Sequence, residues 1–214
     1  MLNRSITMLG ALLVSALLLT SAQAQTLEEG VHYRELARPL NVAIPAGKDG
    51  LIQEFFWYGC IHCFNLETAV QRFKAQLPEN LVFEEVPATF SAVHELHGRA
   101  FYTWQFLDLP ADTHMAIYNE IFVNRNNLRT ERDLAAFFAR QGVSEDRFEQ
   151  MFNSFSVRTK TRVAQNMTAQ AQVRGTPSVV VNGRYLIESG LPGVRTNEDM
   201  LRIAQQLAQQ TAAQ

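Results

Sequence analysis

The chain has 214 residues, of which 47% are hydrophobic and 19% are charged. This balance is typical of soluble globular proteins and excludes a disordered, collagen-like or polytopic membrane chain. The 19 basic and 21 acidic side chains give a formal charge of -2, so no basic excess indicates a nucleic-acid surface, and we expect no nucleic-acid partner.

The N-terminal segment has the pattern of an export signal. Arg4 precedes an apolar run over residues 6–19, and Ala22-Gln23-Ala24 follows with the small residues that signal peptidases accept. The run is shorter than the roughly 20 residues that a membrane-spanning helix needs. We therefore expect residues 1–24 to be a cleaved signal peptide rather than a permanent anchor, which places the mature chain outside the cytoplasm.

A buried strand and a helix open the mature chain. Residues 51–58 are apolar and aromatic with a single carboxylate, Glu54, which predicts a central strand. Apolar residues then recur at helical spacing from Cys60 to Leu77, which predicts a helix that begins at the two cysteines. Residues 81–86 predict a second strand, parallel to the first because a helix separates them.

The middle of the chain is predicted to be helical throughout. Apolar residues keep a period near 3.6 over residues 93–107, and a further helix starts at Asp112. Thr130 and Ser144 are candidate N-caps of two more, and a long helix is expected from Ser156 to Val173. The methionines of this stretch are better explained as its own core than as a cofactor site: Met115, Met151 and Met167.

The sheet resumes near the C-terminus. Two β-rich runs, 178–181 and 184–187, are separated by Asn182-Gly183, which is the strongest short-range hairpin signal. A last helix is expected to start at Thr196 or Asn197. The order strand, helix, strand, helices, hairpin, helix predicts an α/β fold.

The two cysteines of the chain, Cys60 and Cys63, lie at the predicted start of a helix. The first N–H groups of a helix have no intrahelical partner, and the helix dipole adds positive potential, so a thiolate is stabilised there. His62 can add a hydrogen bond or a charge. We therefore expect Cys60 to be the exposed nucleophile with a lowered pKa, and Cys63 to be the shielded resolving thiol.

The predicted thiolate also sets the direction of redox chemistry. An environment that favours the reduced form raises the reduction potential, so the oxidised pair accepts electrons readily from other dithiols. An exported dithiol of this kind is expected to oxidise its substrates. The reaction uses the Cys60–Cys63 disulfide itself and calls for no further cofactor.

Four short segments carry a family resemblance. Taken in order and spacing, they resemble the DsbA family of thioredoxin-fold thiol oxidases over essentially the whole mature chain: Glu54-Phe55-Phe56, Cys60-Ile61-His62-Cys63, Gly175-Thr176-Pro177 and Val181-Asn182-Gly183. The resemblance implies a periplasmic oxidoreductase that donates its disulfide to reduced or unfolded exported polypeptides. It also implies reoxidation by a membrane-bound, quinone-linked partner of the DsbB type.

The resemblance also implies a domain organisation. The fold is expected to be α/β, a thioredoxin fold with an inserted all-helical domain. Its first part spans residues 25–88, the helical insertion spans residues 89–155, and the second thioredoxin part spans residues 156–214. The sequence gives no sign of oligomerisation, so we expect a monomer.

Three further site residues follow from the same resemblance. Pro177 matches the cis-proline that faces the dithiol in the family. The alternative for Pro177 is a trans proline at the start of a strand. Thr176 matches the residue before that proline, which tunes the nucleophile. Glu54 matches a buried carboxylate that relays protons to and from the inner thiol. The alternative is a glutamate that reaches solvent at the sheet edge.

A zinc site is the first rival interpretation of the cysteines. Cys60 and Cys63 together with His94 and His97 offer four ligands of the right kind, although the gap between the pairs is longer than in compact zinc fingers. The two histidines could equally be polar residues on a solvated helix face. The remaining histidines, His32 and His114, are interpreted as surface or satisfied residues.

Two other functions remain open. A disulfide isomerase or reductase could use the same fold, although isomerases generally carry a dimerisation domain for which residues 25–46 are too short. A periplasmic chaperone could bind exported chains without chemistry, through an apolar groove. Trp57, Tyr58, Phe90 and Leu191 could line such a groove, or belong to the core.

Overall fold

The computed structural model describes residues 26–211, so the predicted signal peptide lies outside the described residues. Five strands are present in this part of the chain: β1 (Arg34–Glu35), β2 (Gly50–Phe56), β3 (Leu81–Pro87), β4 (Ser178–Val181) and β5 (Tyr185–Glu188). Seven helices accompany them: α1 (Ile61–Gln76), α2 (Ala92–Phe106), α3 (Asp112–Phe122), α4 (Glu131–Arg140), α5 (Glu145–Phe152), α6 (Phe155–Gln170) and α7 (Asn197–Thr211). None of the helices in the described range is long and apolar enough to cross a membrane.

The strands form one mixed sheet with the order β1-β5-β4-β2-β3. The pairing of β2 with β3 is parallel and that of β4 with β5 is antiparallel, as predicted. Asn182 and Gly183 both have positive φ in the hairpin turn, which is the geometry that matches the twist of the two strands. The edge strand β1 has two residues and was not predicted, because so short a segment shows no alternating pattern.

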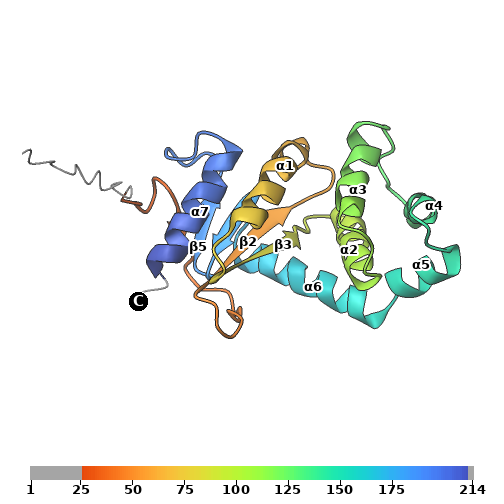
Figure 1. Cartoon of the computed structure of the whole chain (residues 1–214), viewed down its shortest axis with the longest axis horizontal. Coiled ribbons are helices and arrows are strands. Elements are labelled where there is room, and N and C mark those ends of the chain that lie inside the picture. Colours follow the sequence, from red (N-terminus) through yellow and green to blue (C-terminus); the bar gives the residue numbers. More distant parts are fainter. Residues whose placement is uncertain (1–25, 212–214) are drawn as a thin grey trace, which may run out of the picture.

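Helices cover both faces of the sheet (Figure 1). The aliphatic side chains of α7 pack with Ile52, Val179 and Val181 on one face, and α1 lies beside α7 there. Helices α2 and α6 contact β3 from the other face. Both faces of the central strand β2 are therefore buried, which explains its nearly continuous apolar sequence.

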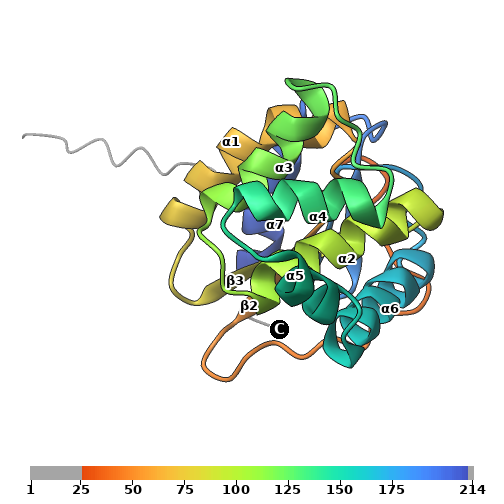
Figure 2. The same cartoon turned by 90° about the vertical axis from the view of Figure 1, so that its right-hand side faces the viewer.

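Helices α2 to α5 form the insertion that faces the viewer in Figure 2. The predicted caps are present: the Thr130 hydroxyl accepts a hydrogen bond from the N–H of Asp133 in a capping box, and the Ser144 hydroxyl accepts one from the N–H of Arg147. The insertion and one sheet face share a single buried cluster, which extends from Phe55 of β2 to Phe148 of α5. The long helix α6 ends at Gln170, three residues before the predicted end, because Gln172 has a positive φ.

The predicted mixed α/β order, with helices inserted between the second long strand and the hairpin, is thus confirmed. Three methionines of the helical stretch between β3 and β4 pack against the buried cluster, also as predicted: Met115, Met151 and Met167.

Candidate active site around the dithiol

The two cysteines lie where strand β2 passes into helix α1. Cys60 is the N-cap residue of α1 with an extended backbone, and its own N–H donates to the carbonyl oxygen of Trp57. Cys63 lies within the first turn and is 1% exposed, whereas Cys60 is half-buried. The predicted difference in exposure between the two thiols is present in the structure.

The sulfur of Cys60 is surrounded by hydrogen-bond donors. The Cys63 thiol donates to the ionised sulfur, and the Thr176 side chain and the backbone N–H groups of Cys63 and His62 do so as well. These contacts lower the pKa of Cys60 to about 5, although partial burial acts in the opposite direction. Cys60 is therefore largely a thiolate at neutral pH when the dithiol is reduced.

Cys63 has the opposite environment. Burial raises the pKa of this thiol well above its ordinary value, and the nearby Cys60 sulfur and Glu54 carboxylate raise it further. The two sulfurs of one short motif therefore differ in charge at neutral pH: the outer one is an anion and the inner one keeps its proton.

The loop before β4 faces the dithiol. The Thr176–Pro177 peptide bond is cis, as predicted. The carbonyl oxygen of Thr176 lies 3.0 Å from the Cys60 sulfur and accepts a hydrogen bond from the neutral thiol. Thr176 thus contacts Cys60 through its backbone in the neutral form and through its side chain in the ionised form.

Glu54 is buried in the central strand, 2% exposed, so the alternative of a solvent-exposed glutamate at a sheet edge is wrong. The parallel register pairs it with Glu85 of β3, which puts both side chains on the face that α1 covers. Burial raises the pKa of Glu54 well above its ordinary value, and the charges of Glu85 and Glu67 raise it further, while His114 and Lys74 lower it.

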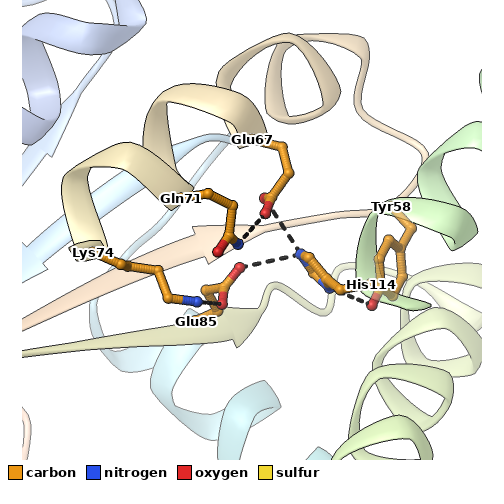
Figure 3. A network of polar contacts seen from close by, with 6 residues as sticks. All are labelled: Tyr58, Glu67, Gln71, Lys74, Glu85 and His114. Carbon is orange, nitrogen blue, oxygen red and sulfur yellow. Dashed lines mark hydrogen bonds and ion pairs between the residues drawn. The ribbon is translucent and has the colours of Figure 1, made fainter. Parts of the chain in front are cut away.

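A polar cluster lies between α1, β3 and α3 (Figure 3). The Nε2 atom of His114 is 3.3 Å from the Glu67 carboxylate and 3.1 Å from the Glu85 carboxylate. The Nδ1 atom of the same ring lies 2.7 Å from the Tyr58 hydroxyl, and the Lys74 ammonium lies 2.8 Å from Glu85. His114 is 1% exposed and has these partners, so the surface interpretation is wrong and the interpretation as a satisfied residue holds.

The sequence contained a signal for part of this cluster. Glu67 and Lys74 lie about one turn and three turns after Cys63, and therefore on the same inward face of α1. Two charged residues in a stripe that packs against a sheet indicate buried partners. His114 had no such signal, because it comes from the helical insertion, far from the dithiol in sequence.

The outer edge of the site is apolar and aromatic. Ile61 and Phe90 are each 44% exposed. The Trp57 ring stacks on His94 with centroids 4.0 Å apart, and Phe90 meets His94 edge-on. Tyr58 belongs to the core, at 1% exposed.

His62 contacts the Cys60 sulfur through its backbone N–H, and its imidazole is exposed.

The geometry does not support the zinc alternative. Among residues 26–211, no group of three or more side chains spaced to hold a metal ion includes either cysteine. His97 is 2% exposed and its Nε2 lies 3.1 Å from the carbonyl oxygen of Leu128, so it does not lie on a solvated helix face. His94 is half-buried and its Nδ1 contacts the Ser91 hydroxyl.

Comparisons with known proteins agree on one family. The family model for the DSBA-like thioredoxin domain matches residues 63–208. Over 210 residues, or 98% of each chain, the chain is 31% identical to the thiol:disulfide interchange protein DsbA of Pseudomonas aeruginosa. It is 34% identical to the protein of that name in Pseudomonas syringae pv. tomato, over 95% of this chain and 94% of the relative.

Solved structures give the same result. The crystal structure of Pseudomonas aeruginosa DsbA matches with a TM-score of 0.79 at 32% identity, covering 86% of this chain and 94% of that one. The oxidoreductase DsbA from Xylella fastidiosa also matches with a TM-score of 0.79, at 29% identity, covering 87% of this chain and 98% of that one.

Proposed function

Because the chain belongs to the DsbA family of thiol:disulfide interchange proteins, we propose that it donates the Cys60–Cys63 disulfide to reduced exported polypeptides. The observation that carries this proposal is the contrast between the two sulfurs. A lowered pKa at Cys60 makes it a good leaving group, and thiol–disulfide exchange proceeds faster as the leaving thiol becomes more acidic. The chain therefore passes its disulfide on rather than keeping it.

The first chemical step forms a mixed disulfide. A client thiolate attacks the Cys60 sulfur, the client–Cys60 bond forms, the Cys60–Cys63 bond breaks, and Cys63 leaves as a thiolate. Burial makes an anion at Cys63 unfavourable, so this sulfur must take up a proton. In our proposal Glu54 supplies it, because burial raises the pKa of this carboxyl and so favours its protonated form, and because Glu54 interacts electrostatically with Cys63.

The second step releases the oxidised client. A second client thiolate attacks the client sulfur of the mixed disulfide, the client disulfide forms, and Cys60 leaves as the stabilised thiolate. The donors from Cys63, Thr176 and the backbone of His62 support that anion. We assign Cys60 as nucleophile, Cys63 as resolving thiol, and Thr176 with Pro177 as the loop that positions the client against the sulfur.

The surface around Cys60 suits an unfolded client. Exposed Ile61 and Phe90 and the half-buried Trp57 offer apolar contacts next to the reactive sulfur. Unfolded polypeptides expose apolar side chains, which such an edge can bind without sequence specificity. The extended segment at Thr176 and Pro177 can pair with client backbone by strand addition.

The remaining parts of the proposal concern the cell. We propose that the chain works as a monomer in the periplasm after removal of residues 1–24, and that a quinone-linked membrane partner of the DsbB type restores its disulfide. We also propose that the chain consists of two thioredoxin parts, residues 25–88 and 156–214, and a helical insertion, residues 89–155.

Trapping of the mixed disulfide tests the proposed function. In Cys63→Ser, a client peptide with one activated disulfide should become covalently attached to Cys60 and stay attached, because no resolving thiol remains. The matched variant Cys60→Ser should trap nothing. Oxidised wild-type protein should convert a reduced two-cysteine peptide to its disulfide form with equal loss of its own disulfide. Equal noncovalent capture by all three proteins, without change in their thiols, would contradict the proposal and favour a chaperone.

A further inference from the structure

Three carboxylates gather in the space beneath the dithiol. Glu54 and Glu85 are neighbours in the register of β2 and β3, and Glu67 approaches them from α1. All three are largely removed from water: Glu54 and Glu67 are each 2% exposed, and the side chain of Glu85 is 6% exposed. Three ionised carboxylates in one buried space would repel one another strongly, so their charges need partners.

The partners are distributed unequally among the three. Glu67 has the His114 imidazole, and Glu85 has both His114 and the Lys74 ammonium. Glu54 has no cation within ion-pair distance, and its Oε2 atom has no hydrogen-bond partner among the described residues. Glu54 is therefore the carboxyl of the three whose negative charge is least compensated, which favours its protonated form, whereas the pKa of Glu85 is lowered to about 2.

His114 supplies positive charge to this buried space. Its Nε2 lies between the Glu67 and Glu85 carboxylates, and both hydrogen bonding and charge attract the ring to these two groups. The titratable groups that face the ring from other elements are these two acids, the Tyr58 hydroxyl and the Glu54 carboxyl, which interacts with His114 electrostatically. Burial lowers the pKa of His114, but the two carboxylates outweigh it and raise the pKa to about 9.

We propose that His114 is a positioning residue for disulfide exchange: its positive charge, delivered from the helical insertion, offsets the negative charge of the neighbouring carboxylates and stabilises the carboxylate that Glu54 becomes when it gives its proton to Cys63. This inference rests on the proposed oxidase function. It extends that function by giving the helical insertion a part in the chemistry, through α3, in addition to covering the sheet.

The charge at His114 acts at a defined step. When the Cys60–Cys63 bond breaks, the proton moves from the Glu54 carboxyl to the Cys63 sulfur, and Glu54 becomes a third carboxylate in the buried space. The nearby imidazolium stabilises that carboxylate, since His114 lowers the pKa of Glu54. On reoxidation the proton returns from Cys63 to Glu54, so the cycle is balanced and needs no additional acid.

The competing explanation is that His114 only fills space. Its ring is packed among aromatic side chains, stacked on Trp104 and edge-on to Phe56, Phe101 and Tyr118. A space-filling role predicts that substitutions of His114 change stability alone. A charge-positioning role predicts a change in the pH dependence of exchange, which packing does not control.

The test compares three variants with the wild-type protein in single-turnover oxidation of a reduced peptide, as a function of pH. His114→Gln removes the charge, and His97→Gln removes a second buried histidine of the insertion, one whose pKa is lowered so that it carries no charge at neutral pH. The double variant His114→Gln with Glu67→Gln removes one negative charge together with the positive one. The pKa of Cys60 is followed in parallel by thiolate absorbance.

We expect His114→Gln to slow the reaction and to move the alkaline limb of the rate profile upward by about one pH unit, because Glu54 becomes a weaker acid. The double variant should return toward the wild-type profile, and His97→Gln should not depart from it. The pKa of Cys60 should stay within a few tenths in all variants. An unshifted profile in His114→Gln, or a double variant no closer to wild type than the single, would overturn the inference. Absence of peptide oxidation by the wild type would instead overturn the proposed function.

A second measurement does not depend on the folding of a variant. Nuclear magnetic resonance of ring-labelled histidine in the oxidised wild-type protein reports the charge of His114 directly. We expect an imidazolium signal that persists up to about pH 8 and that shows contacts to the Tyr58 ring. A neutral His114 at pH 7 would contradict the inference.

Discussion

The two cysteines of the first turn of α1 lie in two regions with opposite effects on a thiol. At the rim, which we define as Cys60, His62 and Thr176, the Cys63 thiol, the Thr176 side chain and backbone N–H groups stabilise an anion on Cys60. In the chamber beneath, defined as Cys63, Glu54, Glu67, Glu85 and His114, burial and like charges keep protons in place. The rim determines which sulfur leaves, and the chamber determines where the proton goes.

The difference teaches that the two functions have different sequence requirements. The rim is built from residues of the dithiol motif at a helix N-terminus and from one loop, so most of it is local in sequence. The chamber takes residues from β2, β3, α1 and α3, so it exists only when the whole fold has formed. Substitutions should separate the two regions, and the predictions below are ordered from the largest expected effect to the smallest.

Removal of the rim sulfur should abolish the chemistry. Cys60→Ser is expected to lower the rate of peptide oxidation by more than about 1,000-fold, because a hydroxyl cannot form the disulfide that the client attacks. The fold should be retained, since Cys60 is a half-buried cap residue without a side-chain capping bond. Rates from quenched single-turnover assays check this, with circular dichroism as the control for folding. Residual oxidation above one per cent of wild type would contradict the assignment.

Removal of the proton carrier in the chamber should slow exchange without changing the rim. Glu54→Gln is expected to reduce the rate at pH 7 by about 100-fold, the lower range for general acid catalysis. The pKa of Cys60 should stay near 5, because its donors remain. Glu84→Gln is the matched control, since this neighbouring β3 residue is exposed. Equal rates for Glu54→Gln and wild type would exclude the proton relay.

A smaller effect is expected at the edge of the rim. Thr176→Val removes the side-chain donor to the ionised sulfur but leaves the backbone carbonyl in place. The pKa of Cys60 should rise by about one unit, and the equilibrium with glutathione should move toward the disulfide form of the protein. Thiolate absorbance against pH measures the shift. A pKa that stays at its wild-type value would show that Thr176 acts through its backbone alone.

The smallest effect on the chemistry should come from a cap in the helical insertion. Thr130→Ala removes the capping box of α4 and should lower the free energy of unfolding by about 1 kcal/mol. The pKa of Cys60 and the rate of exchange should not change, because α4 contacts neither rim nor chamber in the described network. Denaturant unfolding measures the free energy, thiolate absorbance measures the pKa of Cys60, and the single-turnover assay measures the rate of exchange. A shift in the pKa of Cys60 would mean that the insertion is coupled to the rim more tightly than we infer.

Much of the molecule could be predicted from the chain alone. Helix periodicity, the caps at Thr130 and Ser144 and the Asn182-Gly183 turn are local signals, and each element they predicted is present. The rim could be predicted for the same reason, because the dithiol and the helix start are adjacent in sequence. The cis bond before Pro177 followed from the family resemblance rather than from local physics.

The chamber was only partly predictable, because its contacts are tertiary. Glu54 was identified, but the sequence did not indicate which cations lie near it; the structure supplies Lys74 from α1 and His114 from α3. A single histidine on an amphipathic helix has no pattern that reveals its partners. His114 meets Glu67 because α3 packs against α1, and this packing is a property of the folded chain.

The central claim is that Cys60 is more stable as a thiolate than as half of a disulfide, and one measurement tests it directly. A group whose pKa falls on folding adds stability above its unfolded pKa, and that stability is lost as the pH falls through the folded value, about 5 for Cys60. Denaturant unfolding at pH 4 and pH 8 gives the difference in free energy of unfolding between the reduced and the oxidised protein at each pH. The constraint that the disulfide places on the unfolded chain does not vary with pH, so it cancels in the comparison.

We predict that the reduced protein gains about 2 kcal/mol relative to the oxidised protein between pH 4 and pH 8, less than the full pKa shift implies because the sulfur is partly exposed. At pH 8 the reduced form should be the more stable of the two. An oxidised form that is more stable by the same margin at both pH values would contradict the account.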